Sequence, residues 1–170
     1  LSEVLYILED KLSEYIKTIM KYEINKDTFA ILPLENNKSR IIEKNNEYII
    51  DDDPYSVMEH SCSYFGSSLE GRFNGSKDML GSIYKVPVLV EESRNIIFFP
   101  TKSPTTETNA WISLNNIEKY ENNNSNTMLY FKNGKKLMID MPFLSIENQI
   151  LRSTRLESIF RRRKSEEKND

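Results

Sequence analysis

The chain has 170 residues, 38% of them hydrophobic and 29% charged, which is enough for one folded domain with a core and excludes a disordered chain. Its apolar runs are far shorter than the roughly 20 residues of a membrane span, and a single cysteine, Cys62, excludes an internal disulfide and a cysteine-rich zinc site. The net charge of −3 is uneven: residues 1–60 carry 7 Lys and Arg against 13 Asp and Glu, or −6, and residues 61–170 carry 16 against 13, or +3. A basic surface is therefore expected on the later part of the chain.

The first predicted element is an amphipathic helix over residues 2–21. Its apolar residues recur at steps of three and four with charged side chains between them: Leu5, Leu8, Leu12, Ile16 and Ile19. Packing on its own domain is favoured over a coiled-coil arm, because the stretch is shorter than the usual three or four heptads. The mixed charges also differ from a secretory signal, so we expect a cytoplasmic protein.

A β meander and a short helix are predicted next. Three β-type runs, over residues 29–34, 39–44 and 47–50, are separated by pairs of asparagines. Three aspartates followed by Pro54 then predict the start of a helix over residues 55–65, which Gly66 ends.

The segment from Ser61 to Ser82 contains four glycines together with Arg72 and Lys77. Ser67 and Glu70 have the spacing of a capping box for a short helical turn. We expect the rest to be a glycine-rich segment whose exposed backbone N–H groups contact phosphate. The glycines match neither the dinucleotide-binding nor the P-loop pattern, so no cofactor is predicted.

The later part of the chain predicts hairpins and one long helix. Residues 86–90 and 95–99 form the first hairpin, and the second joins 127–132 to 135–140 through Asn-Gly, after a strand at 111–114 and a polar loop at 122–126. A helix follows over residues 143–164. Four of its arginines fall within an arc of about 100°: Arg152, Arg155, Arg162 and Arg163. The predicted fold class is α+β, mainly antiparallel sheet with N-terminal and C-terminal helices.

Catalysis is not predicted. His60, Ser61 and Cys62 are adjacent, and neighbours on a helix point about 100° apart, so they do not form a nucleophile and base pair. The chain has no Gly-x-Ser-x-Gly elbow, and the aspartates at 51–53 lack the spacing of a calcium loop, so neither a catalytic nor a metal site is expected. Two interpretations of the basic C-terminal helix stay open. It forms a basic surface that binds nucleic acid, or its charges only make the helix end soluble and complement the helix dipole.

An ordered set of short motifs resembles the ComK family of competence transcription factors from about residue 22 to residue 160. The motifs are Ser61-Cys62, Phe65-Gly66-Ser67-Ser68, Gly71-Arg72, Phe98-Phe99-Pro100-Thr101, Trp111-Ile112-Ser113, Asn133-Gly134-Lys135 and Glu147-Asn148-Gln149. The aromatic residues in this set are assigned to packing, since large apolar side chains are usually core.

The resemblance implies a DNA-binding activator of DNA-uptake genes that recognises paired A-runs and T-runs in double-stranded DNA, largely through the minor groove. It implies a homodimer or a dimer of dimers, located in the cytoplasm with the nucleoid. Arg72 and Arg152 match arginines of the family motifs and are the leading candidates for DNA contacts. Charge alone adds five weaker candidates: Lys77, Lys85, Arg155, Arg162 and Arg163.

The resemblance divides the chain into the helix at 1–21, a ComK-like domain at 22–164 and a charged tail at 165–170. Family members carry a longer aromatic tail that the adaptor MecA recognises for delivery to the protease ClpCP. The tail here does not match it, which leaves that interaction open. The alternative function is a ComK-like paralogue that acts by protein–protein interaction, as a regulatory subunit without DNA binding.

Overall fold

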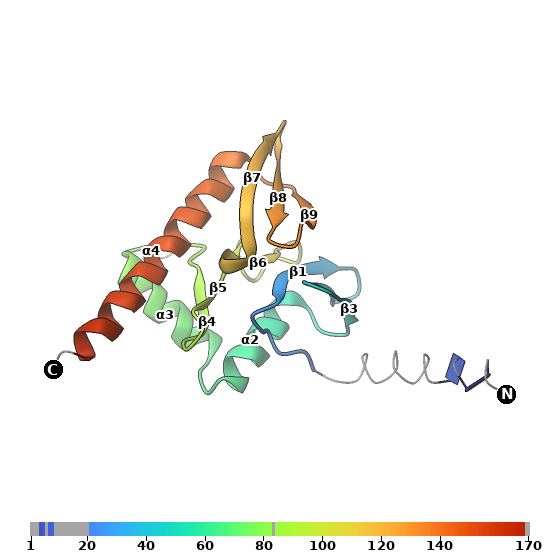
Figure 1. Ribbon diagram of the computed structural model, residues 1–170, viewed down its shortest axis with the longest axis horizontal. Helices are drawn as coiled ribbons and strands as arrows, with labels where there is room; N and C mark the ends of the chain where they lie inside the picture. The colour runs from blue at the N-terminus through green and yellow to red at the C-terminus, as the bar shows by residue number, and fades with distance from the viewer. Residues whose placement is uncertain (1–3, 6, 9–20, 83, 169–170) are drawn as a thin grey trace.

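The computed structural model describes residues 4, 5, 7, 8, 21–82 and 84–168 (Figure 1). Most of the predicted N-terminal helix therefore lies outside the described residues. Four of its apolar residues are described, and all four are helical and exposed: Val4, Leu5, Ile7 and Leu8.

The main sheet contains six antiparallel strands in the order β3-β2-β1-β6-β5-β4. At its centre, Ile31 pairs with Ile41 of one neighbouring strand and with Trp111 of the other. The six strands are β1 (Thr28–Leu34), β2 (Lys38–Glu43), β3 (Glu47–Ile50), β4 (Val88–Glu91), β5 (Ile96–Pro100) and β6 (Trp111–Ser113). The predicted meander and first hairpin are both confirmed.

A smaller antiparallel sheet, in the order β7-β8-β9, follows a short 3₁₀ helix, η1 (Leu114–Asn116). Its strands are β7 (Ile117–Asn123), β8 (Asn126–Phe131) and β9 (Lys136–Ile139), and the helices of the fold are α2 (Pro54–Tyr64), α3 (Leu69–Leu80) and α4 (Phe143–Glu167). The predicted α+β class and the hairpin through Asn-Gly are confirmed. Helix α4 runs on through residues 165–167, which were predicted to be tail.

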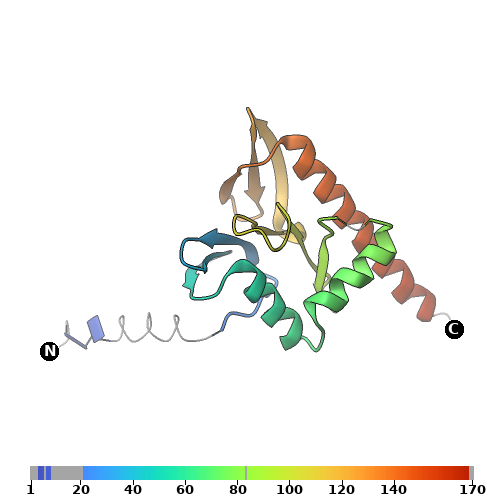
Figure 2. The same ribbon diagram turned by 180° about the vertical axis from the view of Figure 1, so that it is seen from behind.

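The central strands are buried on both faces, and alternate residues pack into different clusters. On one face, α2 and α3 cover a core that includes Ile31, Phe98 and Trp111. On the other face, Phe99 and Ile112 pack with residues of the smaller sheet and the start of α4. Figures 1 and 2 show this order of layers, with α2 and α3 on one side of the main sheet and the smaller sheet on the other. The aromatic motif residues are packing residues, as predicted, with Phe65 half-buried and Phe98, Phe99 and Trp111 fully buried.

The glycine-rich segment is mostly helical, so the expectation of an open segment with exposed N–H groups was wrong, whereas the helical turn predicted within it is correct and extends to 12 residues. It forms helix α3, whose N-cap is Ser68 and not Ser67: the Ser68 Oγ accepts the Gly71 N–H at 3.0 Å, and the Ser68 carbonyl accepts the Arg72 N–H at 3.0 Å. A Cβ at Gly71 would lie 2.9 Å from that Oγ. Each glycine inside a helix costs about 1 kcal/mol relative to alanine, which the burial of Leu69 and Leu80 against the sheet offsets.

Strand β7 was not predicted. Its residues are mostly exposed and polar, and only Ile117 and Tyr120 pack against the core, so the sequence shows no alternating pattern. Pairing with β8 supplies the missing stabilisation. The predicted loop at 122–126 is consequently shorter, since Asn122 and Asn123 end β7 and Asn124, with φ of 56°, makes the turn.

The two sheets are joined by Phe29 and Phe131, whose rings stack with centroids 4.8 Å apart and are almost fully buried. We expect Phe131→Ala to lower the free energy of unfolding by about 3–5 kcal/mol, because it leaves a cavity between the sheets. Urea unfolding followed by the fluorescence of Trp111, the single tryptophan, measures this change. The control is Lys132→Ala, which changes the exposed residue next to Phe131. If Phe131→Ala lowers the free energy of unfolding no more than this control does, the role given to the stacked rings is contradicted.

Candidate nucleic-acid interface

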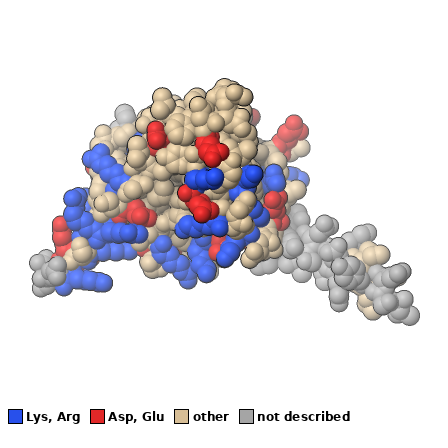
Figure 3. Space-filling view, turned by 45° about the horizontal axis from the view of Figure 1, so that its top comes forward, with Lys and Arg blue, Asp and Glu red and all other residues tan. Residues whose placement is uncertain are grey.

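The C-terminal half of α4 carries four exposed arginines, and three of them are predicted site residues: Arg155, Arg162 and Arg163. The side of α4 that faces the core holds Gln149, Ser153 and Leu156, all buried. Within the described part of the chain, no ion pair involves any of the three arginines, whereas Arg161 pairs with Glu157 at 3.3 Å. Figure 3 shows Lys and Arg across the lower part of this face, including the end where the C-terminus lies, with Asp and Glu among them. These three guanidinium groups are free to meet an anion.

Arg152 lies on the same helix but is held inside the molecule. Its Nη2 donates to the carbonyl of Tyr84 at 2.7 Å and to the Oγ of Ser82 at 2.9 Å, and its Nη1 donates to Gln149 Oε1 at 2.9 Å and to the carbonyl of Lys85 at 3.3 Å. All four acceptors are neutral. Burial lowers the pKa of the Arg152 guanidinium. The geometry therefore assigns this arginine to the connection between α3 and β4.

Arg72 lies on α3 and its charge is already paired. Its Nη1 is 3.0 Å from Oε1 of Glu92, in the turn between β4 and β5, and its side chain is mostly buried. The Nε atom is buried without a hydrogen-bond partner among the described residues. The carbonyl of Glu92 also accepts a hydrogen bond from Lys164 of α4 at 2.7 Å. One turn residue thus links the two helices.

The two lysine candidates lie in different places. Lys85 follows α3, adopts a positive φ of 48°, and places its Nζ 5.4 Å from the ring centroid of Tyr84. Lys77 lies five residues after Arg72 on α3, which is about 140° further round the helix, and it lines a hollow of about 770 Å³ between α2 and α3. Lys77 is therefore separated from the Arg72 side of α3.

The seven predicted residues consequently do not form one uniform basic patch. The structure brings Lys85, Arg152 and Arg155 to the middle of α4 and places Arg162 and Arg163 at its end. Arg72 and Arg152, the leading candidates, both bind internal acceptors, so their direct contact with DNA stays a prediction. Sequence reasoning missed Tyr84, which is exposed beside Lys85 and gave no signal as a single tyrosine among nine.

The adjacent His60, Ser61 and Cys62 are each engaged separately. The His60 Nε2 lies 3.1 Å from the Glu23 carboxylate, and the Ser61 Oγ accepts the N–H of Ile24 at 3.1 Å. Cys62 is fully buried, and that burial raises the pKa of its thiol to about 11. This arrangement offers no nucleophile paired with a base among the three. No group of three or more metal-ligating side chains occurs within the described residues.

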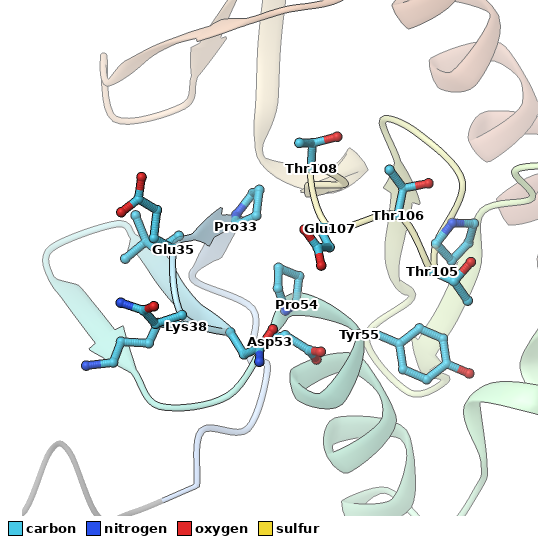
Figure 4. A pocket seen from close by; sticks show the side chains of 14 residues that line it. Pro33, Glu35, Lys38, Asp53, Pro54, Tyr55, Thr105, Thr106, Glu107 and Thr108 are labelled. Carbon is cyan, nitrogen blue, oxygen red and sulfur yellow. The ribbon is translucent and has the colours of Figure 1, made fainter.

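A second hollow, of about 510 Å³, lies far from α4 in the fold, between the β1–β2 turn and the loop before β6 (Figure 4). Three carboxylates and one lysine line it: Glu35, Asp53, Glu107 and Lys38. Figure 4 shows Glu107, Pro54 and Asp53 near its centre. The excess of negative charge makes this surface unsuitable for a phosphate backbone.

A mixed α+β domain with unpaired arginines along one helix is typical of a nucleic-acid-binding protein. Comparison with known proteins agrees with this class. The family model described as ComK protein matches residues 19–165. The chain is also 34% identical over 146 residues to the competence transcription factor of Bacillus subtilis (strain 168), an alignment that covers 84% of this chain and 76% of that protein.

The chain therefore belongs to the ComK family and is a ComK-type transcription regulator. No solved structure matches it. Within the described residues, no helix is long and apolar enough to cross a membrane.

Burial of Cys62 predicts a thiol that does not react in the native protein. With a thiol pKa of about 11, only about 1 in 1,000 side chains is ionised at pH 8, and the thiolate is the reactive form. We expect labelling by an aromatic disulfide reagent at pH 8 to be slow until urea unfolds the protein. Ser63→Cys, which adds a thiol at an exposed neighbouring position, provides the control and should show one fast and one slow reaction. Fast labelling of the unmodified chain would contradict this prediction.

Proposed function

We propose that the protein activates transcription of DNA-uptake genes by binding paired A-runs and T-runs through the DNA minor groove. The observation that carries this proposal is the set of exposed arginines on α4, Arg155, Arg162 and Arg163, which have no carboxylate partner among the described residues. Membership of the ComK family supports the regulatory role.

The electrostatics of such DNA suit these side chains. A-tracts have a narrow minor groove with an enhanced negative potential, and that potential attracts inserted arginines. Hydrogen-bonding groups in the minor groove distinguish little beyond A·T from G·C pairs, so short runs of one base-pair type are the natural target.

Helix α4 itself does not enter that groove. An α-helix with side chains is about 10–12 Å across, whereas the minor groove of B-DNA is about 6 Å wide. We therefore assign the contact to individual side chains that project from α4, with the helix lying along the edge of the groove. Arg72, Lys77, Lys85 and Arg152 are secondary candidates. Arg72 and Arg152 bind internal acceptors, Lys77 lines the hollow between α2 and α3, and the Lys85 ammonium lies over the Tyr84 ring.

Paired boxes need paired subunits. Two copies that sit at a fixed helical phase on DNA would double the protein surface that meets the duplex and require both boxes at the correct spacing. We propose a homodimer, or a dimer of dimers, acting in the cytoplasm at the nucleoid.

We expect Arg155→Ala, and the double change Arg162→Ala with Arg163→Ala, each to weaken binding to a duplex with one A-run and one T-run. The affinity should fall about tenfold per arginine, because charge-assisted hydrogen bonds to phosphate are removed. The slope of log affinity against log salt should decrease by about 0.9 for each phosphate that is no longer neutralised. Fluorescence anisotropy of a labelled duplex at several salt concentrations measures both quantities.

Arg40→Ala is the matched control, since it removes one exposed arginine from β2, which lies toward the opposite end of the main sheet from β5 and α4. It should leave both affinity and slope unchanged. If the folded, unmodified protein binds no duplex at low salt, DNA binding is rejected in favour of the alternative, a ComK-like regulatory subunit that acts through other proteins.

The minor-groove assignment has its own test. Replacing A·T by inosine·cytosine pairs keeps the minor-groove acceptors and removes the thymine methyl from the major groove. We expect such a duplex to bind nearly as well as the original and a duplex with G·C pairs to bind at least tenfold more weakly. Equal weakening by both replacements would point to the major groove instead.

A further inference from the structure

The connection between α3 and β4 presents one exposed aromatic ring. The side chain of Tyr84 is 65% exposed. Among the described residues, its ring is approached by one cation, Lys85, whose Nζ lies 5.4 Å from the ring centroid. A ring this exposed contributes little to the core, so its area is available to a binding partner.

Two side chains of α4 hold the backbone carbonyls of Tyr84 and Lys85. Arg152 Nη2 donates to the Tyr84 carbonyl at 2.7 Å and to Ser82 Oγ at 2.9 Å, and its Nη1 reaches the Lys85 carbonyl at 3.3 Å. The buried Gln149 donates to the Lys85 carbonyl at 2.9 Å and to that of Pro100 at 2.8 Å. The connection is therefore fixed both to α4 and to the end of β5.

The backbone at this point is also in a costly conformation. Lys85 has φ of 48°, which a residue with a Cβ adopts rarely and at a cost of order 1–3 kcal/mol. A conformation of this kind persists only where the surroundings impose it. The hydrogen bonds from Arg152 and Gln149 are those surroundings, and they hold the backbone from which the exposed Tyr84 side chain projects.

The ring lies beside the cations of the proposed DNA-binding surface. Arg155 follows Arg152 by three residues on α4, so the two are surface neighbours about 5–6 Å apart at their Cβ atoms. Figures 1 and 2 both show the α3–β4 connection running beside the middle of α4. Lys85, next to Tyr84 in the chain, and Arg155, one turn of α4 after Arg152, are therefore the cations nearest to this segment in the proposed surface.

We propose that Tyr84 contacts DNA directly, with its ring against the deoxyribose wall of the minor groove, and that Arg152 and Gln149 are positioning residues that present it. This inference rests on the proposed function. An aromatic side chain on a backbone that is held before binding adds contact area, and the ordering of that backbone costs no further entropy on binding. From the sequence, Arg152, which follows the motif Glu147-Asn148-Gln149, was expected to contact DNA. In this proposal Arg152 and Gln149 instead hold the backbone that carries the contacting residue, Tyr84.

The experiment measures affinity and salt slope for the same duplex with Tyr84→Ala, Tyr84→Phe and Arg152→Met. Tyr84→Ala should weaken binding about tenfold, since removing an aromatic side chain that packs on a nucleotide costs roughly 5- to 150-fold. Its salt slope should stay unchanged because the ring neutralises no phosphate. Tyr84→Phe should bind within about twofold of the unmodified chain. Tyr64→Ala is the matched control, a tyrosine that is 64% exposed at the end of α2, and it should have no effect.

Arg152→Met separates positioning from direct DNA binding. We expect it to weaken binding about as much as Tyr84→Ala with an unchanged salt slope, and the double variant to be no weaker than either single one, because both act through one ring. Arg152→Lys should recover part of the affinity by reaching one of the carbonyls. Trp111 fluorescence and urea unfolding verify that each variant is folded. If Arg152→Met does not fold, Tyr84→Ala alone tests the proposal, because it changes only an exposed side chain.

Each result has a distinct meaning. If Tyr84→Ala binds as well as the unmodified chain, the inference is overturned while the proposed function stands. If Arg152→Met lowers the salt slope by about 0.9, Arg152 binds a phosphate and its positioning role is overturned. If the unmodified chain binds no DNA, both the proposed function and this inference fall together.

Discussion

The burial of the main sheet on both faces is the constraint on which the rest of the structure depends. Residues such as Phe98 and Phe99, adjacent on β5, point to opposite faces and pack into different clusters. Each face then needs its own cover, which α2 and α3 provide on one side and the smaller sheet with α4 on the other. Because Leu156 of α4 packs with Leu89 and Ile97, the opposite side of that helix necessarily faces solvent.

That placement of α4 divides the cations of the chain by role. Arginines on the outer side are exposed, whereas Arg152, nearer the packed side, meets backbone carbonyls of the α3–β4 connection. A guanidinium has five donors in a fixed planar arrangement, which suits it to hold several carbonyls at once. The same residue type is therefore exposed at one position of the helix and binds local backbone one turn away.

On α3, too, an internal contact occupies a cation that the sequence offered as a candidate for DNA binding. The carboxylate of Glu92 satisfies Arg72, and the carbonyl of the same residue binds Lys164. Because the Glu92 carboxylate of this pair is exposed, the pair contributes little to stability, typically about 1 kcal/mol or less. Its larger consequence is geometric, because it fixes α3 and the end of α4 to one turn of the main sheet.

The elements that the sequence predicted well are those whose burial follows a simple period. The hairpin through Asn133-Gly134 alternates apolar and polar residues, and α4 repeats apolar residues at helical spacing, so both were correct. The full length of α3 and the strand β7 were not predicted, because packing and strand pairing stabilise them and their own sequence patterns do not show it. Gly71 and Gly75 lower the helix propensity of α3, and the polar residues of β7 hide its pairing with β8.

The amino-acid sequence alone determined the fold class, the family resemblance and the presence of a cationic helix, because composition, motif order and periodicity are local properties of the chain. It did not determine which arginines are free. That was decided by the tertiary structure, since whether a guanidinium meets water, a carboxylate or a backbone carbonyl depends on which distant segment packs beside it. Tyr84 could not be singled out from the sequence for the same reason, because the residue that holds its backbone carbonyl, Arg152, lies more than sixty positions later in the chain.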